Sequence, residues 1–211
     1  MIIHNFEQGS EAWFNVRLGR FTGTRMKKLQ SAKSTASYQD VIANVAAEIV
    51  TGEKEETYCD ANMQRGIDME PEAAQCYSEL FDIKLQEVGF CEPDEDIEYH
   101  DYVGVSPDRL IYTDGGLEIK CPKANTYFKY IEKKILPTEY KWQVQGCLFI
   151  TGRKWWDFMA YYPKLKPFII RVYPDLEMHA KIDHEIKIAV EEVKRQIQNY
   201  KEYEGLSQIE S

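Results

Sequence analysis

The sequence predicts an α/β domain in which helices flank a central mixed β-sheet. Helix-length segments with a period near 3.6 come first, short runs rich in Val, Ile and Tyr follow between residues 83 and 120, and helix and strand signals alternate after that. The 211 residues are 44% hydrophobic and 29% charged, which is sufficient for one continuous core without disulfides or a structural metal. This composition excludes disordered, repeat and fibrous proteins, and we expect a single domain over residues 1–211.

Three helices are predicted in the N-terminal half. Ser10 is of a residue type that caps helices, and a short helix follows it through Leu18. The second helix spans residues 38–50 and ends at Thr51-Gly52. The third spans residues 60–80, and Pro71 must kink it or begin a new turn. The apolar residues expected on the inner faces of the first and third helices are Trp13, Phe14, Val16, Met63, Ile67, Ala74, Tyr77 and Phe81.

The C-terminal half is predicted to contain the sheet and two more helices. The turn signal Thr113-Asp114-Gly115-Gly116 separates two strand-like runs, 109–113 and 116–121, which indicates a hairpin. A helix over residues 138–150 and two strands over 155–162 and 168–173 follow. A long amphipathic helix over about 174–203 closes the chain, and no linker or internal repeat interrupts it.

The net charge of −9, from 26 basic and 35 acidic residues, argues against a polyanionic partner when it is taken as a single number. The charge is uneven, however, because residues 39–119 carry 4 basic and 21 acidic groups, whereas residues 120–171 carry 11 basic and 3 acidic groups. The basic segment has aromatic residues interleaved, as in a phosphate-attracting face. Its charges are equally typical of a solvated lysine-rich surface, so both interpretations stay open.

The sequence also bears on compartment. No stretch is long and apolar enough to cross a bilayer, and the first residues lack the basic and long apolar regions of a signal peptide. The five cysteines contain no C-x-x-C pair, so we expect reduced side chains rather than a zinc or iron–sulfur site. We therefore expect a cytoplasmic protein with no membrane partner.

The predicted hairpin carries the residues with the clearest chemical potential. Asp108 follows Pro107, and Glu118-Ile119-Lys120 begins ten residues later. Residues two apart in a strand share a face, so Glu118 and Lys120 should point together while Ile119 enters the core. Two carboxylates and a lysine that meet at a hairpin suit metal-assisted phosphodiester hydrolysis, in which the carboxylates bind Mg²⁺ and the lysine positions or activates water.

A second segment repeats this spacing and tests the assignment. Pro174-Asp175 is also followed by Glu185-Ile186-Lys187 ten residues later, but the surrounding apolar residues recur with helical period. In a helix, Glu185 and Lys187 would diverge by roughly 200°, and Asp175 and Glu185 would lie about 15 Å apart. We therefore assign the chemistry to Asp108, Glu118 and Lys120, with a surface hairpin bearing ordinary ion pairs as the alternative.

A series of motifs in a fixed order gives the sequence a family resemblance. They begin with Glu7-Gln8-Gly9-Ser10-Glu11-Ala12-Trp13, Arg17-Leu18-Gly19 and Thr22-Gly23-Thr24, and continue with Gly66 and Glu70, Ser106-Pro107-Asp108, Gly116-Leu117-Glu118-Ile119-Lys120-Cys121-Pro122, and Gln143-Val144-Gln145. With 155–163, these motifs resemble the phage lambda-type exonucleases (the alkaline exonuclease or viral recombinase family), which have a restriction-endonuclease-like core. The resemblance covers most of the chain from Glu7 to about Lys166.

The resemblance implies an activity and partners. A chain of this family would be a magnesium-dependent 5′→3′ exonuclease that degrades the 5′ strand of linear duplex DNA with a 5′-phosphorylated end and leaves a 3′ single-stranded overhang. It would bind two Mg²⁺ ions per active site, for which Mn²⁺ is expected to substitute. It would form a ring-shaped homotrimer, or toroid, and work with a single-strand annealing protein in phage recombination, encoded by a phage or prophage in a bacterial host.

The resemblance also implies roles for individual residues. Asp108 and Glu118 would be shared metal ligands, assisted by the Ile119 carbonyl, and Glu70 would complete the second metal position. Lys120 would orient and help to deprotonate water. The pocket for the terminal 5′ phosphate would contain Arg17, Thr24, Ser106 and Gln143, with Trp13 beside them. Thr24 stands where serine is found in the family example, and it retains a hydroxyl donor.

Two other functions remain as alternatives. An endonuclease of the same superfamily, either a restriction enzyme or a junction resolvase, would use the same ligands and would cut a covalently closed circle. A non-catalytic acidic module that mimics DNA, or binds a basic partner, is suggested by the excess of acids in residues 39–119. Such a module would show no magnesium-dependent hydrolysis.

Overall fold

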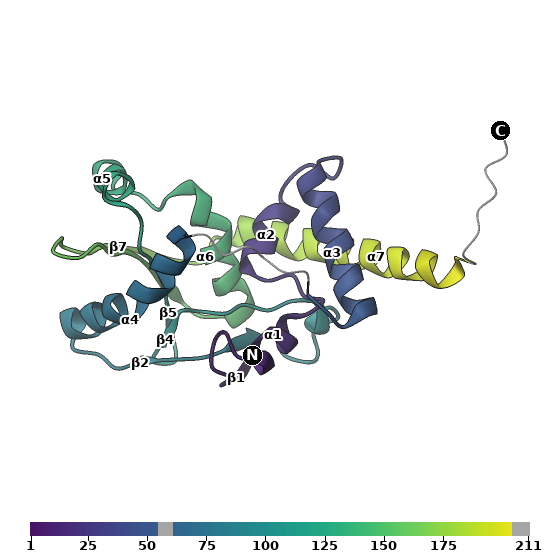
Figure 1. Ribbon diagram of the computed structural model, residues 1–211, viewed down its shortest axis with the longest axis horizontal. Coiled ribbons are helices and arrows are strands. Elements are labelled where there is room, and N and C mark those ends of the chain that lie inside the picture. Colours follow the sequence, from purple (N-terminus) through teal and green to yellow (C-terminus); the bar gives the residue numbers. More distant parts are fainter. Residues whose placement is uncertain (55–60, 204–211) are drawn as a thin grey trace.

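A computed structural model describes residues 1–54 and 61–203 (Figure 1). Cys59 and the expected helix start at Asp60 lie outside these residues. The elements in chain order are β1 (Ile2–His4), α1 (Glu11–Arg17), α2 (Gly23–Leu29), α3 (Ala36–Thr51), α4 (Ala61–Phe81), β2 (Leu85–Gln86), β3 (Phe90–Glu92), the short 3₁₀ turn η1 (His100–Tyr102), β4 (Arg109–Ile111), β5 (Gly115–Lys120), α5 (Ala124–Lys133), α6 (Thr138–Thr151), β6 (Trp155–Ala160), β7 (Phe168–Val172) and α7 (Leu176–Glu202).

The main sheet is mixed, as the sequence predicts. Its five strands lie in the order β2-β4-β5-β6-β7, with β5 and β6 parallel and the other neighbours antiparallel. The predicted hairpin is confirmed, since β4 pairs with β5 in a register that puts Arg109 opposite Leu117 and Ile111 opposite Gly115. A separate two-stranded sheet joins β1 to β3.

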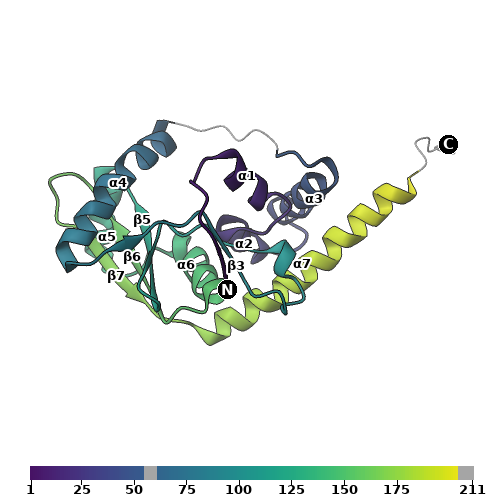
Figure 2. The ribbon, with the colours of Figure 1, turned by 90° about the horizontal axis from the view of Figure 1, so that it is seen from below.

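Helices cover both faces of this sheet. On one face, α4 packs Ala73, Ala74 and Tyr77 against Leu117 and Met159 of the central strands. On the other face, residues of α5 and α6 pack on β6, and Figure 2 shows the strands lying between α4 and α6. The alternation along β5 therefore sends Leu117 and Ile119 toward α4, whereas Glu118 and Lys120 point toward α6.

The long C-terminal helix is confirmed with nearly the expected bounds. Asp175 caps α7 by accepting a hydrogen bond from the amide of Met178, at 3.1 Å. The buried stripe of α7, which includes Ile182, Ile186 and Val193, belongs to the same core as residues of α3 and α6. Figure 1 shows its C-terminal part extending away from the rest of the molecule. Glu185 and Lys187 thus lie on a helix, as expected for the second copy of the motif spacing.

The structure differs from the sequence-based expectations in the strand β1, in two helices and in which apolar side chains face inward. The helices α2 and α5 were not predicted, because each is short and lacks a long apolar stripe. The expectation that Phe14, Met63, Ile67 and Phe81 face inward is wrong, since their exposed fractions lie between 41% and 59%. Phe14 of α1 and Met63 and Ile67 of α4 line a surface hollow rather than the core, because helical period shows which residues share a face of one helix but not what covers that face.

Two further features of the helices concern Pro71 and membrane spans. The helix α4 runs through Pro71 without a break, and Pro71 is exposed, so water can reach the backbone at the point where one helical hydrogen bond is lost.

Over residues 1–54 and 61–203, no helix is both long and apolar enough to cross a membrane.

Candidate active site

The hairpin brings the two predicted metal ligands to one place. Asp108 immediately precedes β4, and its Oδ2 accepts a hydrogen bond from the backbone amide of Ile119, at 2.6 Å. Ile119 follows Glu118 directly on β5, so a turn in the chain puts the Asp108 carboxylate beside the backbone of the second ligand. The local reason is the turn at Tyr112, Thr113 and Asp114, after which Gly115 and Gly116 already pair with Ile111 and Leu110 as the start of β5. The turn therefore lies about two residues earlier than the sequence predicts.

Glu118 is held from two sides and retains one free oxygen. Its side chain is 1% exposed, and Oε1 accepts a hydrogen bond from Gln143 Nε2 of α6 at 2.6 Å and forms an ion pair with Lys120. Within the part of the chain that the structure describes, Oε2 is buried and has no hydrogen-bond partner. An unpaired buried carboxylate oxygen is costly, and a divalent cation would satisfy it. The residues present therefore fit a metal ion.

The electrostatics of these groups follow from burial and mutual proximity. Burial raises the pKa of Glu118 to about 7, against the lowering effect of Lys120 and with a further increase from Asp108. Burial also raises the pKa of Asp108. Burial would lower the pKa of Lys120, but Glu118 and Asp108 raise it above its usual value, so Lys120 is a protonated hydrogen-bond donor.

Glu70 lies near this pair but is bound to another residue. Its Oε1 accepts a hydrogen bond from Arg109 Nη1 at 2.8 Å, and burial followed by the charge of Asp108 raises its pKa. Among the described residues, no three His, Cys, Asp or Glu side chains form a ready-made metal-binding group. Glu70 is thus close enough for its charge to interact with Asp108 and Glu118, and its hydrogen-bond partner is Arg109.

Arg109 is the residue of this site that the sequence reasoning missed. It is the residue that follows Asp108, and its position directly beside a proposed ligand was the available signal. The periodicity of the sequence predicts only that Arg109 lies on a strand. Its hydrogen bond to Glu70 depends on how α4 crosses the sheet, which the sequence does not show.

Three of the residues expected in the phosphate pocket form one cluster. Ser106 Oγ accepts hydrogen bonds from Arg17 Nη1 at 2.5 Å and from Trp13 Nε1 at 3.1 Å, and the Arg17 guanidinium lies 4.1 Å from the centre of the Trp13 ring. Trp13 also donates to the carbonyl of Gly89 at 2.9 Å. Burial, and then the charge of Arg25, lower the pKa of Arg17 to about 10, which leaves it a cation at neutral pH.

Among the described residues, the other two expected pocket residues make no hydrogen bond to this cluster. Gln143 bonds to Glu118, and its Cγ lies 3.4 Å from the position of a Cβ added to Gly23, so it stands between the carboxylates and the start of α2. Thr24 is exposed in the first turn of α2. The structure therefore unites Trp13, Arg17 and Ser106, and places Gln143 with the carboxylates.

A surface hollow of about 1080 Å³ lies beside these groups. Its walls include Trp13 from the cluster with Arg17, and Glu70 and Arg109 from the carboxylate region. The exposed apolar side chains Phe6, Phe14, Met63 and Ile67 line it as well. A ligand in this hollow would thus touch Trp13 at one end and Glu70 and Arg109 at the other, whereas Arg17, Asp108 and Glu118 do not line it.

Comparison with known families gives one match. Residues 12–154 match the family described as the YqaJ-like viral recombinase domain, and this range contains every residue assigned to the site above. No curated protein sequence matches the chain.

Solved structures give further similarity. An alkaline exonuclease, LHK-Exo from Laribacter hongkongensis, is 32% identical with a TM-score of 0.81, over 91% of this chain and 96% of that chain. The structure of LHK-Exo in complex with dAMP is 31% identical with a TM-score of 0.82, over the same shares. A phage-related exonuclease from Haemophilus somnus has a TM-score of 0.63 at 12% identity, over 86% of this chain and 96% of that chain, and shows likeness of fold alone.

Proposed function

Since the chain belongs to the YqaJ-like viral recombinase domain family, we propose that it is a magnesium-dependent exonuclease, which degrades the 5′ strand of linear duplex DNA and leaves a 3′ single-stranded overhang. The similarity to an alkaline exonuclease over nine-tenths of the chain supports a nuclease acting on DNA. The observation that carries the proposal is the hairpin that places Asp108 beside Glu118, with one buried carboxylate oxygen left free.

The ligands for Mg²⁺ would be the carboxylates of Asp108 and Glu118 and the carbonyl of Ile119. Glu70 would complete a second cation position, and Mn²⁺ would substitute because it accepts the same oxygen ligands. Divalent cations bound there would polarise the scissile phosphodiester and favour ionisation of the attacking water.

The protein's own groups orient the reaction. Gln143 donates to Oε1 of Glu118 and so leaves Oε2 directed at a ligand. Lys120 holds its protonated amine at Glu118, where it can donate hydrogen bonds to water or to a phosphoryl oxygen. This favours orientation and charge stabilisation by Lys120 over abstraction of a proton by it.

A terminal phosphate would bind at the cluster of Trp13, Arg17 and Ser106. Arg17 is a cation with few competing partners, and a guanidinium can bind two phosphate oxygens at once. The Ser106 hydroxyl already accepts two hydrogen bonds and can donate its proton to a phosphate oxygen. Thr24 and Gln143 would contact the same end group from the side of α2 and α6.

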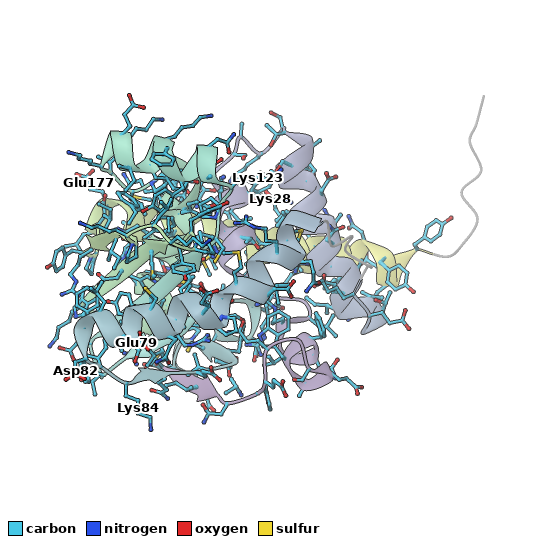
Figure 3. The ribbon with its side chains drawn as sticks, turned by 60° about the vertical axis from the view of Figure 1, so that its left-hand side comes forward. Lys28, Glu79, Asp82, Lys84, Lys123 and Glu177 are labelled. Atoms are coloured by element: carbon cyan, nitrogen blue, oxygen red, sulfur yellow. The ribbon has the colours of Figure 1, made fainter. Side chains whose placement is uncertain are left out.

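The DNA would lie along exposed lysines near this end group. Lys28 of α2 and Lys123 before α5 are both exposed, and Figure 3 shows both away from Glu79 and Asp82 at the C-terminal end of α4. We also propose a homotrimeric ring with a basic channel and an acidic exterior, which works beside a single-strand annealing protein in phage-type recombination. Sedimentation of the purified protein tests the ring, since it must give a mass of three chains.

One digestion series tests the proposed activity. The substrates are linear duplex with 5′-phosphate ends, the same duplex with 5′-hydroxyl ends, and a covalently closed circle, each with Mg²⁺ or with EDTA. We expect Mg²⁺-dependent release of nucleotides from the linear substrates, faster with the 5′ phosphate, and an intact circle.

The outcomes separate the alternatives. Cleavage of the closed circle indicates an endonuclease, and absence of any hydrolysis indicates a non-catalytic module. Asp108→Ala should retain DNA binding and lose digestion. Full digestion by that variant would contradict the assignment of Asp108.

A further inference from the structure

Arg109 is a buried cation shared between three acceptors. It is 9% exposed, and its Nη1 donates to Glu70 Oε1 at 2.8 Å and also to the backbone carbonyl of Asp108. Its Nη2 lies 3.2 Å from Glu87 Oε1, on the loop that follows β2. The guanidinium therefore fills the space between α4, the start of β4 and the sheet edge.

These contacts give the guanidinium a fixed position. The bond to the carbonyl of Asp108 ties it to the backbone of a proposed metal ligand, and the strand pairing of Arg109 with Leu117 holds its own backbone in place. Glu70 can exchange partners by rotation of its side chain, whereas Arg109 remains at the site. Any cation that binds Glu70 must then share the carboxylate with a resident positive charge.

The two proposed cation positions differ in this respect. At the first, Glu118 Oε2 is buried without a hydrogen-bond partner among the described residues, so a cation gains a free ligand atom. At the second, Glu70 is already paired, so a cation must displace or tolerate Arg109. Like charges repel each other more strongly at a partly buried site than at the exposed surface, because solvent screens them less.

We propose that Arg109 is a built-in counter-ion for Glu70 that weakens the second divalent-cation position relative to the first. This inference rests on the proposed function, because it presupposes that Asp108 and Glu118 hold the first cation. Arg109 is in these terms a positioning residue, since it acts through Glu70. The second cation would then be retained mainly when DNA phosphate adds negative charge beside it.

The test is a titration of the DNA-free protein with Mn²⁺. Binding is measured by calorimetry and by the electron paramagnetic resonance signal of the free ion. The wild type should show one tight and one weak site. Arg109→Gln removes the resident charge while it keeps a hydrogen-bond donor for Glu70, and the second site should tighten about tenfold or more. The first site should change much less.

Three matched variants control the result. Arg109→Lys keeps the positive charge and should leave the second site as weak as in the wild type. Glu87→Gln removes the exposed partner of the same guanidinium, leaves the pair with Glu70 in place, and should change the second affinity by less than about threefold. Glu70→Gln should abolish the second site in the wild-type and the Arg109→Gln backgrounds alike.

Each outcome decides the matter. Circular dichroism and thermal melting confirm folding, and Arg109→Met, which keeps the packing of the aliphatic stem, replaces Arg109→Gln if that variant does not fold. Equal second-site affinity in the wild type and in a folded charge-free variant contradicts this inference alone, as do two equally tight sites in the wild type. A wild-type protein that binds no Mn²⁺ contradicts both this inference and the proposed function.

Discussion

At the scale of single residues, the same spacing of Asp, Glu and Lys occurs twice and only one copy brings the side chains together. Glu118 and Lys120 form an ion pair because alternate residues of β5 share a face. In the other copy, Lys187 pairs with Asp183 one helical turn away, at 2.7 Å, as the helical period of α7 requires. The backbone conformation between the residues, rather than their spacing, determines which chemistry is available.

This contrast gives a paired substitution experiment. Lys120→Met should lower the maximal rate of digestion by about a hundredfold or more, because it removes the protonated donor at the reacting phosphate. The Michaelis constant for linear duplex should change little, since most binding comes from other contacts. Single-turnover digestion of a 5′-phosphorylated duplex measures the rate.

Lys187→Met is the matched control. It removes a lysine from the same sequence pattern but from an exposed helix surface, so digestion should proceed at the wild-type rate. An equal loss in both variants would mean that Lys120 has no specific role in the reaction.

The cluster of Trp13, Arg17 and Ser106 carries a second residue-scale prediction. Arg17→Ala should abolish most of the preference for 5′-phosphate over 5′-hydroxyl ends, because a buried guanidinium that can bind two phosphate oxygens is lost. Initial rates on the two duplexes give the ratio. Ser106→Ala should reduce the preference less, and an unchanged ratio in Arg17→Ala would exclude this cluster as the phosphate pocket.

At the scale of elements, strand β5 of the hairpin depends on a glycine where it packs closely against the neighbouring strand β6. A Cβ added to Gly116 would lie less than 3.0 Å from ring atoms of Trp156, whose side chain is fully buried on the neighbouring strand β6. The ring cannot move aside without disturbing the core. Gly116 therefore allows the close approach of β5 and β6 that holds Glu118 in place.

Gly116→Ala should consequently destabilise the protein by about 2 kcal/mol. Denaturant unfolding measures the change. Gly66→Ala is the control. Among the described residues, no side chain or more distant backbone lies within 4 Å of its added Cβ, and alanine is favoured within a helix, so the stability should stay equal or rise. Equal stability of Gly116→Ala and the wild type would show that Trp156 can relax.

At the scale of the whole molecule, charge distribution matters more than net charge. The total of −9 sums the acidic segment 39–119, which supplies Glu70, Asp108 and Glu118, and the basic segment 120–171. Lys28 of α2 and Lys123 after β5 are both exposed, and Figure 3 shows both away from the acidic C-terminal end of α4. A molecule that is acidic overall can in this way present a basic surface to DNA.

Salt dependence of binding tests this surface. Each phosphate contact contributes about 0.9 to the slope of log affinity against log salt concentration, so replacing Lys28 and Lys123 by glutamine should lower the slope by about 2. Binding of duplex DNA is followed by fluorescence anisotropy in the Asp108→Ala background to prevent digestion. Lys84→Gln, at the far end of α4 in Figure 3, is the control and should leave the slope unchanged. An unchanged slope in the double variant would mean that DNA does not contact Lys28 and Lys123.

By itself, the sequence determined the class of fold, the hairpin and the long C-terminal helix, and it predicted that Asp108, Glu118 and Lys120 form one candidate site. These follow from local periodicity, which reports which residues share a face over a few turns or strands. Only the tertiary structure decided that Arg109 holds Glu70, that Gln143 holds Glu118, and that Arg17 meets Ser106 from 89 residues away. Such contacts depend on how α1, α4 and α6 pack on the sheet, and burial by that packing leaves one oxygen of Glu118 free and raises its pKa.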